Sequence, residues 1–161
     1  MRNLFILLSI SILSACNSNG NSNEGNATRG TLDTLELGMN LNMSKFELYS
    51  HLDSMVRQER AYFLNGGYAF DFDFGPTARI NPDYRSDTLF QLSYRIIPQY
   101  EWESAKDVSL KFESIYKKQY GRPDEVNNES DGEVYSRWDF ENVQLEVVHT
   151  PHHCFVNYNL K

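Results

Sequence analysis

The sequence repeats one structural plan, in which a capped amphipathic helix is followed by a series of alternating strands. Ser44 with Glu47, and Ser104 with Asp107, each place an acidic residue three positions after a serine, which is the pattern of a capping box at a helix start. The two serines lie 60 positions apart. That spacing resembles an internal repeat and predicts that each half of the chain builds the same kind of unit.

Hydrophobic periodicity indicates the elements of each unit. Apolar residues recur at helical spacing after each cap, which predicts helices over residues 45–58 and 105–120. Gly121 and Pro123 are placed to end the second helix. Apolar and polar residues then alternate with the period of two that is typical of a strand. Strands are predicted over residues 61–64, 68–74, 89–97, 134–140, 143–150 and 153–160.

These elements predict an α+β fold of two helix-plus-three-strand units, with an antiparallel sheet and with the helices packed on one face. Polar residues dominate 75–88 and 124–133, which are predicted to be loops. The folded domain is expected over residues 32–161, and its two halves over 32–98 and 99–161. The sequence leaves open whether these halves share one sheet or form two.

The amino terminus has the features of an export signal. Arg2 gives it a positive charge, and residues 4–13 form an apolar run that is shorter than the roughly 20 residues of a membrane-spanning helix. Ser14 and Ala15 supply the small residues of a cleavage site. Residues 1–15 are therefore predicted to be a signal peptide that is removed.

Residues 13–16, with the sequence Leu-Ser-Ala-Cys, resemble the lipobox of bacterial lipoproteins, in which the cysteine is invariant. The resemblance implies cleavage before Cys16, diacylation of its thiol, and firm membrane anchoring, because two acyl chains hold a bilayer better than one. An aspartate after the cysteine resembles an inner-membrane retention signal, so Asn17 favours the outer membrane. The alternative is an ordinary secretory signal in which Cys16 is incidental.

Composition limits the partners that the chain can have. Asn, Ser and Gly dominate residues 16–31, and a segment without large apolar residues does not offset its ordering entropy, so a flexible tether is expected there. The chain has 22 acidic and 15 basic residues and a formal net charge of −7. That charge argues against nucleic acid as a partner, and it leaves the lipid on Cys16 as the expected link to a membrane.

Two short motifs resemble a known family. Residues 35–39, Leu-Glu-Leu-Gly-Met, precede the first capped helix, and residues 120–123, Tyr-Gly-Arg-Pro, end the second. They resemble motifs of small outer-membrane lipoproteins of the BamE (SmpA/OmlA) type, and the tandem repeats are similar to the β-lactamase-inhibitor-protein fold. Two extra residues follow Met39 here, and the first helix lacks a Gly-x-Pro ending. The resemblance implies a non-enzymatic accessory lipoprotein that binds envelope proteins, and it carries over no binding residue.

One cluster contains residue types that bind metals. His149, His153 and Cys154 surround the turn of a predicted hairpin, and imidazole and thiolate groups are ligands for zinc or copper. Strand alternation places His153 and Cys154 on opposite faces. The simpler interpretation is a surface hairpin with incidental histidines and with Cys154 as a small buried hydrophobe. No metal site and no cofactor is predicted.

The acidic residues that follow the first helix are a second candidate for ion binding. Asp71, Asp73, Asp83 and Asp87 could gather around calcium, but they lack the spacing of a calcium-binding loop. Strand alternation already places Asp71 and Asp73 toward solvent. A solvent-facing acidic strand is therefore the simpler interpretation.

Aromatic residues outside the predicted core are a third candidate. Trp102 lies between Glu101 and Glu103, which could indicate contact with a sugar, although a helix-entry turn with a buried tryptophan is the simpler interpretation. Aromatic side chains mark a protein interface only where they cluster on the surface. The aromatic residues expected at loops or strand edges are Tyr62, Tyr84, Tyr100 and Trp102.

The sequence contains no Gly-x-Ser-x-Gly elbow and no phosphate-binding loop, so the chain is not predicted to be an enzyme. The first hypothesis is an accessory or protein-binding lipoprotein of the cell envelope. The alternative is an inhibitor or small-ligand-binding domain that uses a concave sheet face, and a metal protein or enzyme using His149, His153 and Cys154 comes third. An exposed aromatic patch would favour a protein partner, and an enclosed pocket would favour a small ligand.

Overall fold

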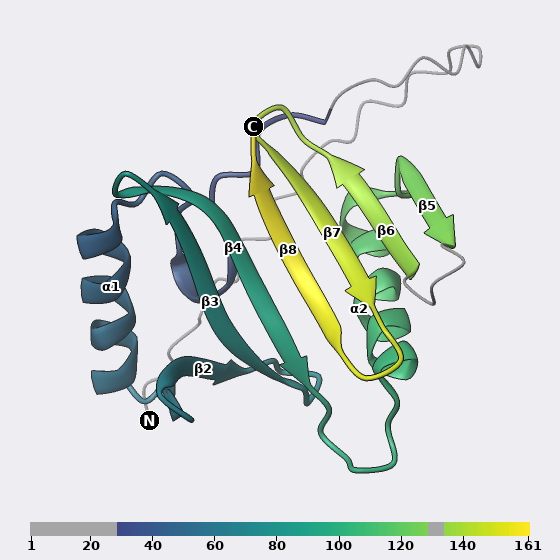
Figure 1. Ribbon diagram of the computed structural model, residues 1–161, viewed down its shortest axis with the longest axis horizontal. Coiled ribbons are helices and arrows are strands. Elements are labelled where there is room, and N and C mark those ends of the chain that lie inside the picture. The colour runs from purple at the N-terminus through teal and green to yellow at the C-terminus, as the bar shows by residue number, and fades with distance from the viewer. Residues whose placement is uncertain (1–28, 129–133) are drawn as a thin grey trace, which may run out of the picture.

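The computed structural model describes residues 29–128 and 134–161 and shows a mixed α+β fold built on one sheet of eight antiparallel strands (Figure 1). The predicted signal peptide, Cys16 and most of the predicted tether lie outside these residues. The strand order across the sheet is β1-β2-β3-β4-β8-β7-β6-β5. The elements in chain order are η1 (Glu36–Gly38), α1 (Lys45–Arg57), β1 (Tyr62–Leu64), β2 (Gly67–Asp71), β3 (Thr77–Arg85), β4 (Thr88–Ile97), α2 (Ala105–Tyr120), β5 (Glu125–Asn128), β6 (Val134–Asp139), β7 (Val143–His149) and β8 (Cys154–Leu160).

Each half of the chain builds a four-stranded meander, and the two meanders join through their last strands. β4 pairs with β8 in antiparallel register, with Leu92 opposite Tyr158 and Ile96 opposite Cys154. The first half thus supplies β1 to β4 and the second half supplies β5 to β8 of a single sheet. The two halves therefore share one sheet, which the sequence had left open.

The predicted number of three strands per unit is wrong, because each predicted loop contains a strand. β3 lies inside the predicted loop 75–88, and β5 lies inside the predicted loop 124–133. β3 is held by backbone pairing on both edges, and Pro82 interrupts a pattern that would otherwise have indicated a strand. β5 is a short edge strand that pairs with β6 alone. Neither segment has the sustained apolar alternation on which the prediction relied.

A single hydrophobic core joins the sheet to both helices. Buried side chains alternate along the strands, so that Tyr94, Val156 and Val147 lie side by side on one face of the sheet. α2 packs against β7 and β8 and lies behind the sheet in the view of Figure 1. Burial of this apolar face is the main source of stability. The buried helical side chains of the core include Leu48, Leu52, Met55, Val108, Phe112 and Tyr116.

The other face of the sheet is polar. The Gln91 side-chain amide donates to the Asn159 carbonyl oxygen at 2.8 Å, and the Asn159 amide donates to the Glu146 carboxylate at 2.9 Å. Beside them, the Ser93 hydroxyl donates to Asn157 at 2.7 Å. These bonds cross β4, β8 and β7, so the polar groups at the middle of the sheet satisfy one another.

Both predicted capping boxes are present. The Ser44 hydroxyl accepts from the Glu47 backbone N–H at 3.3 Å, and the Glu47 carboxylate accepts from the Ser44 N–H at 2.8 Å. Ser104 and Asp107 make the same pair of bonds, both at 3.1 Å. α2 ends at Gly121, whose φ of 83° suits a glycine. Within the described parts of the chain, no helix has the length and apolar character to cross a membrane.

The described chain begins with a clasp at Arg29. The Arg29 guanidinium forms an ion pair with Asp124 and donates to the backbone carbonyl of Tyr120 at 3.0 Å. The Arg29 carbonyl in turn accepts from the Glu141 N–H at 3.0 Å. Arg29 falls within the predicted tether, so the packed part of the chain starts before the predicted boundary at 32.

The cap of α2 yields a test of the fold. Replacing Ser104 with Ala removes the hydroxyl that accepts from the Asp107 N–H, and we expect a loss of about 1 kcal/mol in the free energy of unfolding. Urea unfolding followed by circular dichroism measures it. Ser114→Ala, on the exposed surface of the same helix, is the matched control and is expected to leave the stability unchanged or slightly raised. Equal effects of the two changes would contradict the capping role.

Candidate functional site

The three residues considered for metal binding lie in different environments. Cys154 pairs with His149 across β7 and β8 and is buried in the core, where desolvation raises the pKa of its thiol to about 12. His153 is exposed, and its Nδ1 lies 3.4 Å from the Arg95 guanidinium. Among the described residues, no group of three His, Cys, Asp or Glu side chains is placed to hold a metal ion.

His149 instead bridges the sheet and α2. Its Nδ1 lies 2.9 Å from the hydroxyl of Ser109, and that hydroxyl donates to the Lys106 backbone carbonyl at 2.9 Å. Nδ1 is therefore the donor in the His149–Ser109 bond and carries a proton, which a neutral imidazole supplies in its Nδ1–H tautomer. Desolvation lowers the pKa of His149, which favours the same form. Ser109 is buried in the helix, so this Ser–His pair is a structural bridge and not an exposed nucleophile.

The acidic residues considered for calcium lie at opposite ends of β3. Asp71 pairs with Thr77 at the start of β3, and its carboxylate accepts from the Tyr62 hydroxyl at 2.7 Å and the Thr77 hydroxyl at 2.5 Å. Asp83 and Asp87 belong to the far end of that strand and to the turn after it. The four carboxylates therefore do not converge on one point.

An exposed aromatic surface lies where α1 meets the β1–β2 hairpin. The Tyr49 ring packs on Tyr68 with centroids 5.8 Å apart, and Phe63 packs on the same Tyr68 at 4.8 Å. Phe46 lies one turn before Tyr49 on α1 and is 79% exposed, and Phe63 is 61% exposed. We call Phe46, Tyr49, Phe63 and Tyr68 the aromatic flank.

The aromatic flank is held in a defined position. The Tyr68 hydroxyl donates to the Asp53 carboxylate at 2.5 Å, which ties the hairpin to α1. Desolvation, followed by the effect of Asp53, raises the pKa of Tyr68 to about 12, so its hydroxyl remains a donor at neutral pH. The sequence contained a signal for this surface, because Phe46 and Tyr49 fall outside the Leu48–Leu52–Met55 stripe that faces the core. The contact with Phe63 depends on the hairpin and had no local signal.

The loop between β4 and α2 carries a second exposed aromatic pair. Tyr100 and Trp102 stack with centroids 5.2 Å apart and with ring planes 8° apart. Trp102 is 77% exposed, so the interpretation of a buried tryptophan is wrong. The buried residue of this loop is Glu103, at 7% exposure, and it forms an ion pair with Lys111. Glu101 and Glu103 are therefore not an equivalent pair of carboxylates around Trp102.

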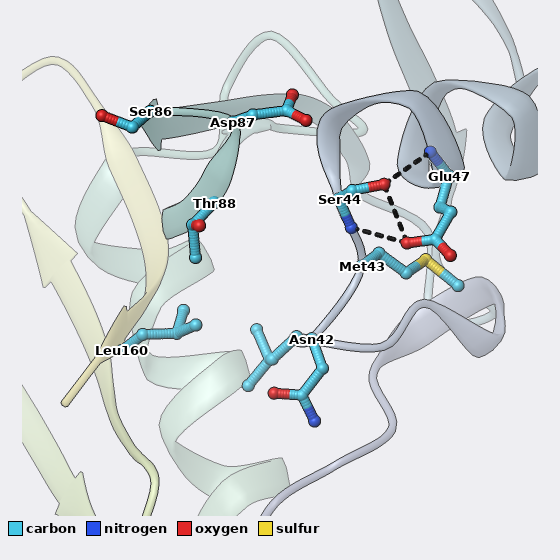
Figure 2. Close-up of a pocket in the computed structure, with 9 residues that line it drawn as sticks. Asn42, Met43, Ser44, Glu47, Ser86, Asp87, Thr88 and Leu160 are labelled. Carbon is cyan, nitrogen blue, oxygen red and sulfur yellow. Dashed lines mark hydrogen bonds between the residues drawn. The ribbon is translucent and has the colours of Figure 1, made fainter.

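An open pocket lies between the start of α1 and the β3–β4 turn (Figure 2). Its volume is about 340 Å³, near the lower end of the range for ligand-binding sites. The polar atoms of Ser44 and Glu47 on its wall are already bonded to each other in the capping box. The lining residues are Leu41, Asn42, Met43, Ser44, Glu47, Ser86, Asp87, Thr88 and Leu160.

A carboxyl group lies among tyrosines inside the core. Glu36, in the short helix η1, accepts from the Tyr158 hydroxyl at 3.1 Å and the Tyr116 hydroxyl at 3.4 Å, and these two hydroxyls lie 3.2 Å apart. Desolvation raises the pKa of Glu36 above its ordinary value, although the tyrosine bonds oppose the shift. No local pattern predicted this cluster, because its members come from three distant segments. Its role is to hold the N-terminal segment on α2 and β8.

Comparison with known proteins does not identify a family for this chain. No described protein family and no curated protein matches the chain. Among solved structures, the chain is similar to a DUF4309 family protein (YjgB) from Bacillus subtilis, with 14% sequence identity and a TM-score of 0.45 over 80% of this chain and 88% of that one. Neither the fold nor the function described for this chain rests on that likeness.

The buried acid predicts a pH dependence of stability. Because the pKa of Glu36 is raised on folding, its contribution is complete below pH 4.5 and is lost as the pH rises through the folded-state pKa. Glu36→Gln keeps the shape and stays neutral, so we expect its stability to fall less than that of the parent between pH 4.5 and pH 8. Urea unfolding at a series of pH values measures the difference. Glu101→Gln, at an exposed position, is the control, and parallel pH profiles for parent and Glu36→Gln would refute the assignment.

Proposed function

We propose that this chain is a lipid-anchored protein of the bacterial cell envelope whose domain binds another envelope protein through the aromatic flank. Residues 13–16 support cleavage after position 15 and lipidation of Cys16, and Asn17 supports the outer membrane as its location. The observation that carries the binding role is the aromatic flank, where Phe46 and Phe63 remain exposed although the core beside them is fully packed. The role is that of a non-enzymatic accessory module.

The composition of the aromatic flank is that of an interface centre. Aromatic residues are enriched at the buried centres of protein interfaces, where burying one ring stabilises a complex far more than burying a typical surface side chain. Phe46 and Phe63 keep most of their surface in water in this chain, which is unfavourable unless a partner covers them. Tyr49 and Tyr68 lie beside them and already pack on each other.

The flank is also rigid enough to act as a preformed surface. It joins a helix to a hairpin, and the Tyr68–Asp53 hydrogen bond fixes one to the other. Aromatic side chains have few rotatable bonds, so they lose little conformational entropy when a partner covers them. Preorganisation of this kind raises affinity without adding contacts.

The proposal includes the arrangement of the helices, which we place on the same face of the sheet. Tyr68 of β2 contacts Tyr49 of α1, and His149 of β7 contacts Ser109 of α2. The strand register puts Tyr68 and His149 on the same side of the sheet as the buried core residues. The aromatic flank then forms the outer border of the core, beside α1.

Small-ligand binding is the alternative function, and the pocket of Figure 2 is the observation that favours it. Its open form and its mutually bonded wall groups make it a weaker candidate than the flank. A ligand held there would be sensitive to Asp87 and Thr88, which line the pocket on the side of the β3–β4 turn. Loss of function on changing those two residues, with the flank intact, would favour the alternative.

Lipidation is tested in cells that express the full chain. Cys16→Ser removes the thiol that the lipid requires, so we expect the protein to move from the membrane fraction to the soluble fraction. Fractionation with immunoblotting, and metabolic labelling with a clickable fatty acid, provide two independent readouts. Cys154→Ser is the matched control and is expected to retain both membrane association and label. Persistent labelling of Cys16→Ser would exclude the predicted anchor.

The binding role is tested by photocrosslinking in intact cells. A photoreactive amino acid at Phe46 is expected to give a defined heterologous adduct, and Phe63→Ser in the same chain is expected to reduce its yield several-fold, because Phe63 belongs to the same surface. Val126→Ser removes an exposed apolar side chain at the opposite edge of the sheet and is expected to leave the yield unchanged. Recovery of only uncrosslinked monomer, or equal loss with both serine changes, counts against the aromatic flank.

A further inference from the structure

The aromatic loop, residues 98–104, presents one flat surface to solvent. Tyr100 covers one face of the Trp102 indole, because the two rings stack with nearly parallel planes. Trp102 is nevertheless 77% exposed, so its opposite face is open. The loop therefore offers a single indole face backed by a second ring. Such a face attracts cations through the quadrupole of the ring, and tryptophan is the strongest of the aromatic side chains in this respect.

The aromatic loop is fixed at both ends. At its start, the side chain of Gln99 occupies the space beside Gly75, where a Cβ atom would lie 2.0 Å from the Gln99 Oε1. At its end, buried Glu103 forms an ion pair with Lys111, and its N–H donates to the Tyr100 carbonyl at 3.1 Å. The stacked rings lie between these two attachments. The loop that carries the exposed indole therefore contacts the rest of the fold on both sides of the stacked rings.

Near the aromatic loop, the carboxylate of Glu101 has no basic partner among the ion pairs of the described residues. Lys111 is paired with Glu103, and Lys106 lies close enough to Asp107 to help lower the pKa of that carboxyl, after the larger effect of the Ser104 hydrogen bonds. Glu101 is exposed and directly precedes Trp102, and among the described residues it forms no ion pair. An open indole face beside an unpaired carboxylate favours a ligand that is both flat and positively charged.

We infer that the aromatic loop binds a cationic side chain of a partner protein, with arginine preferred, the guanidinium lying over the free face of Trp102 and beside the Glu101 carboxylate. Arginine suits this site because its guanidinium is planar and weakly hydrated and stacks on aromatic rings. The same chain already holds one guanidinium in this way, since the Cζ of Arg85 lies 3.5 Å from the Phe90 ring centroid. The net charge of −7 also favours the approach of a basic partner.

The position of the loop favours a partner protein over the anchoring membrane. The loop follows β4 at the end of the sheet where Ile96 pairs with Cys154, the first residue of β8. Arg29 contacts Glu141 near the other end of β8, where Lys161 bonds to Asn142. Figure 1 shows the loop extending beyond the sheet on the side away from the carboxyl terminus. The loop therefore lies at the end of the domain away from Arg29, where the tether of the proposed lipid anchor begins, an argument that rests on the proposed lipidation.

The test uses the chain from residue 16 with Cys16→Ser, which retains every residue of the described fold. The indole N–H signals of Trp102 and Trp138 are followed by NMR during titration with hexa-arginine amide. We expect a saturable shift of the Trp102 signal alone, because Trp138 is fully buried and its N–H is bonded to the Gly121 carbonyl. An unchanged Trp138 signal also shows that each variant remains folded.

Two variants and a matched control distinguish binding of hexa-arginine at the aromatic loop from its general attraction to a negatively charged protein. The affinity of Trp102→Leu, followed through the backbone signals of the loop, is expected to fall about two- to fivefold, the size of an exposed cation–π contact. Glu101→Gln is expected to weaken binding more than Glu59→Gln, which removes the same charge from an exposed position outside the loop. Equal losses for Glu101→Gln and Glu59→Gln would show general attraction only and would overturn the inference.

Three further probes identify a different occupant. Hexa-glutamate amide is expected not to bind, and binding of it would overturn the inference. A shift of Trp102 with neutral phosphatidylcholine vesicles, without a shift with hexa-arginine, would assign the loop to a bilayer. A shift with chitotetraose alone would assign it to a sugar. Photocrosslinking at Phe46 does not depend on Trp102. A negative result for arginine binding by the aromatic loop can therefore be distinguished from a negative result for partner binding by the aromatic flank.

Discussion

The pairing of β4 with β8 is the contact on which the rest of the structure depends. Each half of the chain forms a meander that exposes one apolar face, and neither half alone places a helix and a sheet around a complete core. Register between the two last strands sets Tyr94 beside Val156 and Leu92 beside Tyr158, which makes the two apolar faces continuous. One sheet and one core follow from this pairing, because it places the buried faces of β4 and β8 on the same side.

Local patterns predicted most of the secondary structure, and contacts between distant segments account for what they missed. The capping boxes at Ser44 and Ser104 located both helices, and the period of two located six strands. β3 and β5 had no comparable signal, because Pro82 cuts short the apolar alternation of Ala78 and Ile80 in β3, and β5 is a short edge strand. The Glu36 cluster and the His149–Ser109 bridge join segments far apart in sequence, so no local pattern reported them. Trp102 was misjudged because apolarity alone predicts burial, whereas the stack on Tyr100 leaves it in water.

The aromatic flank and the aromatic loop have one property in common: each contains aromatic side chains that are not part of the packed core. Interior positions along the sheet are already filled by Tyr94, Tyr158, Trp138 and Phe112. The rings of the aromatic flank and of the aromatic loop lie outside that packing but are fixed by it, through Asp53 in one case and Glu103 in the other. A small domain can in this way present two separate rigid surfaces without weakening its core, and two weak contacts on one body act together through a raised effective concentration.

The clasp at Arg29 determines where a mechanical load enters the domain. A pull transmitted along the residues before Arg29 reaches first its ion pair with Asp124 and its bonds to Tyr120 and Glu141. Tyr120 ends α2, Asp124 follows it, and Glu141 follows β6, so tension passes into the second half of the sheet. α1 and the β1–β2 hairpin lie at the far edge, outside that line of force. If the chain is anchored as proposed, the aromatic flank therefore lies outside the path along which tension on the tether enters the sheet.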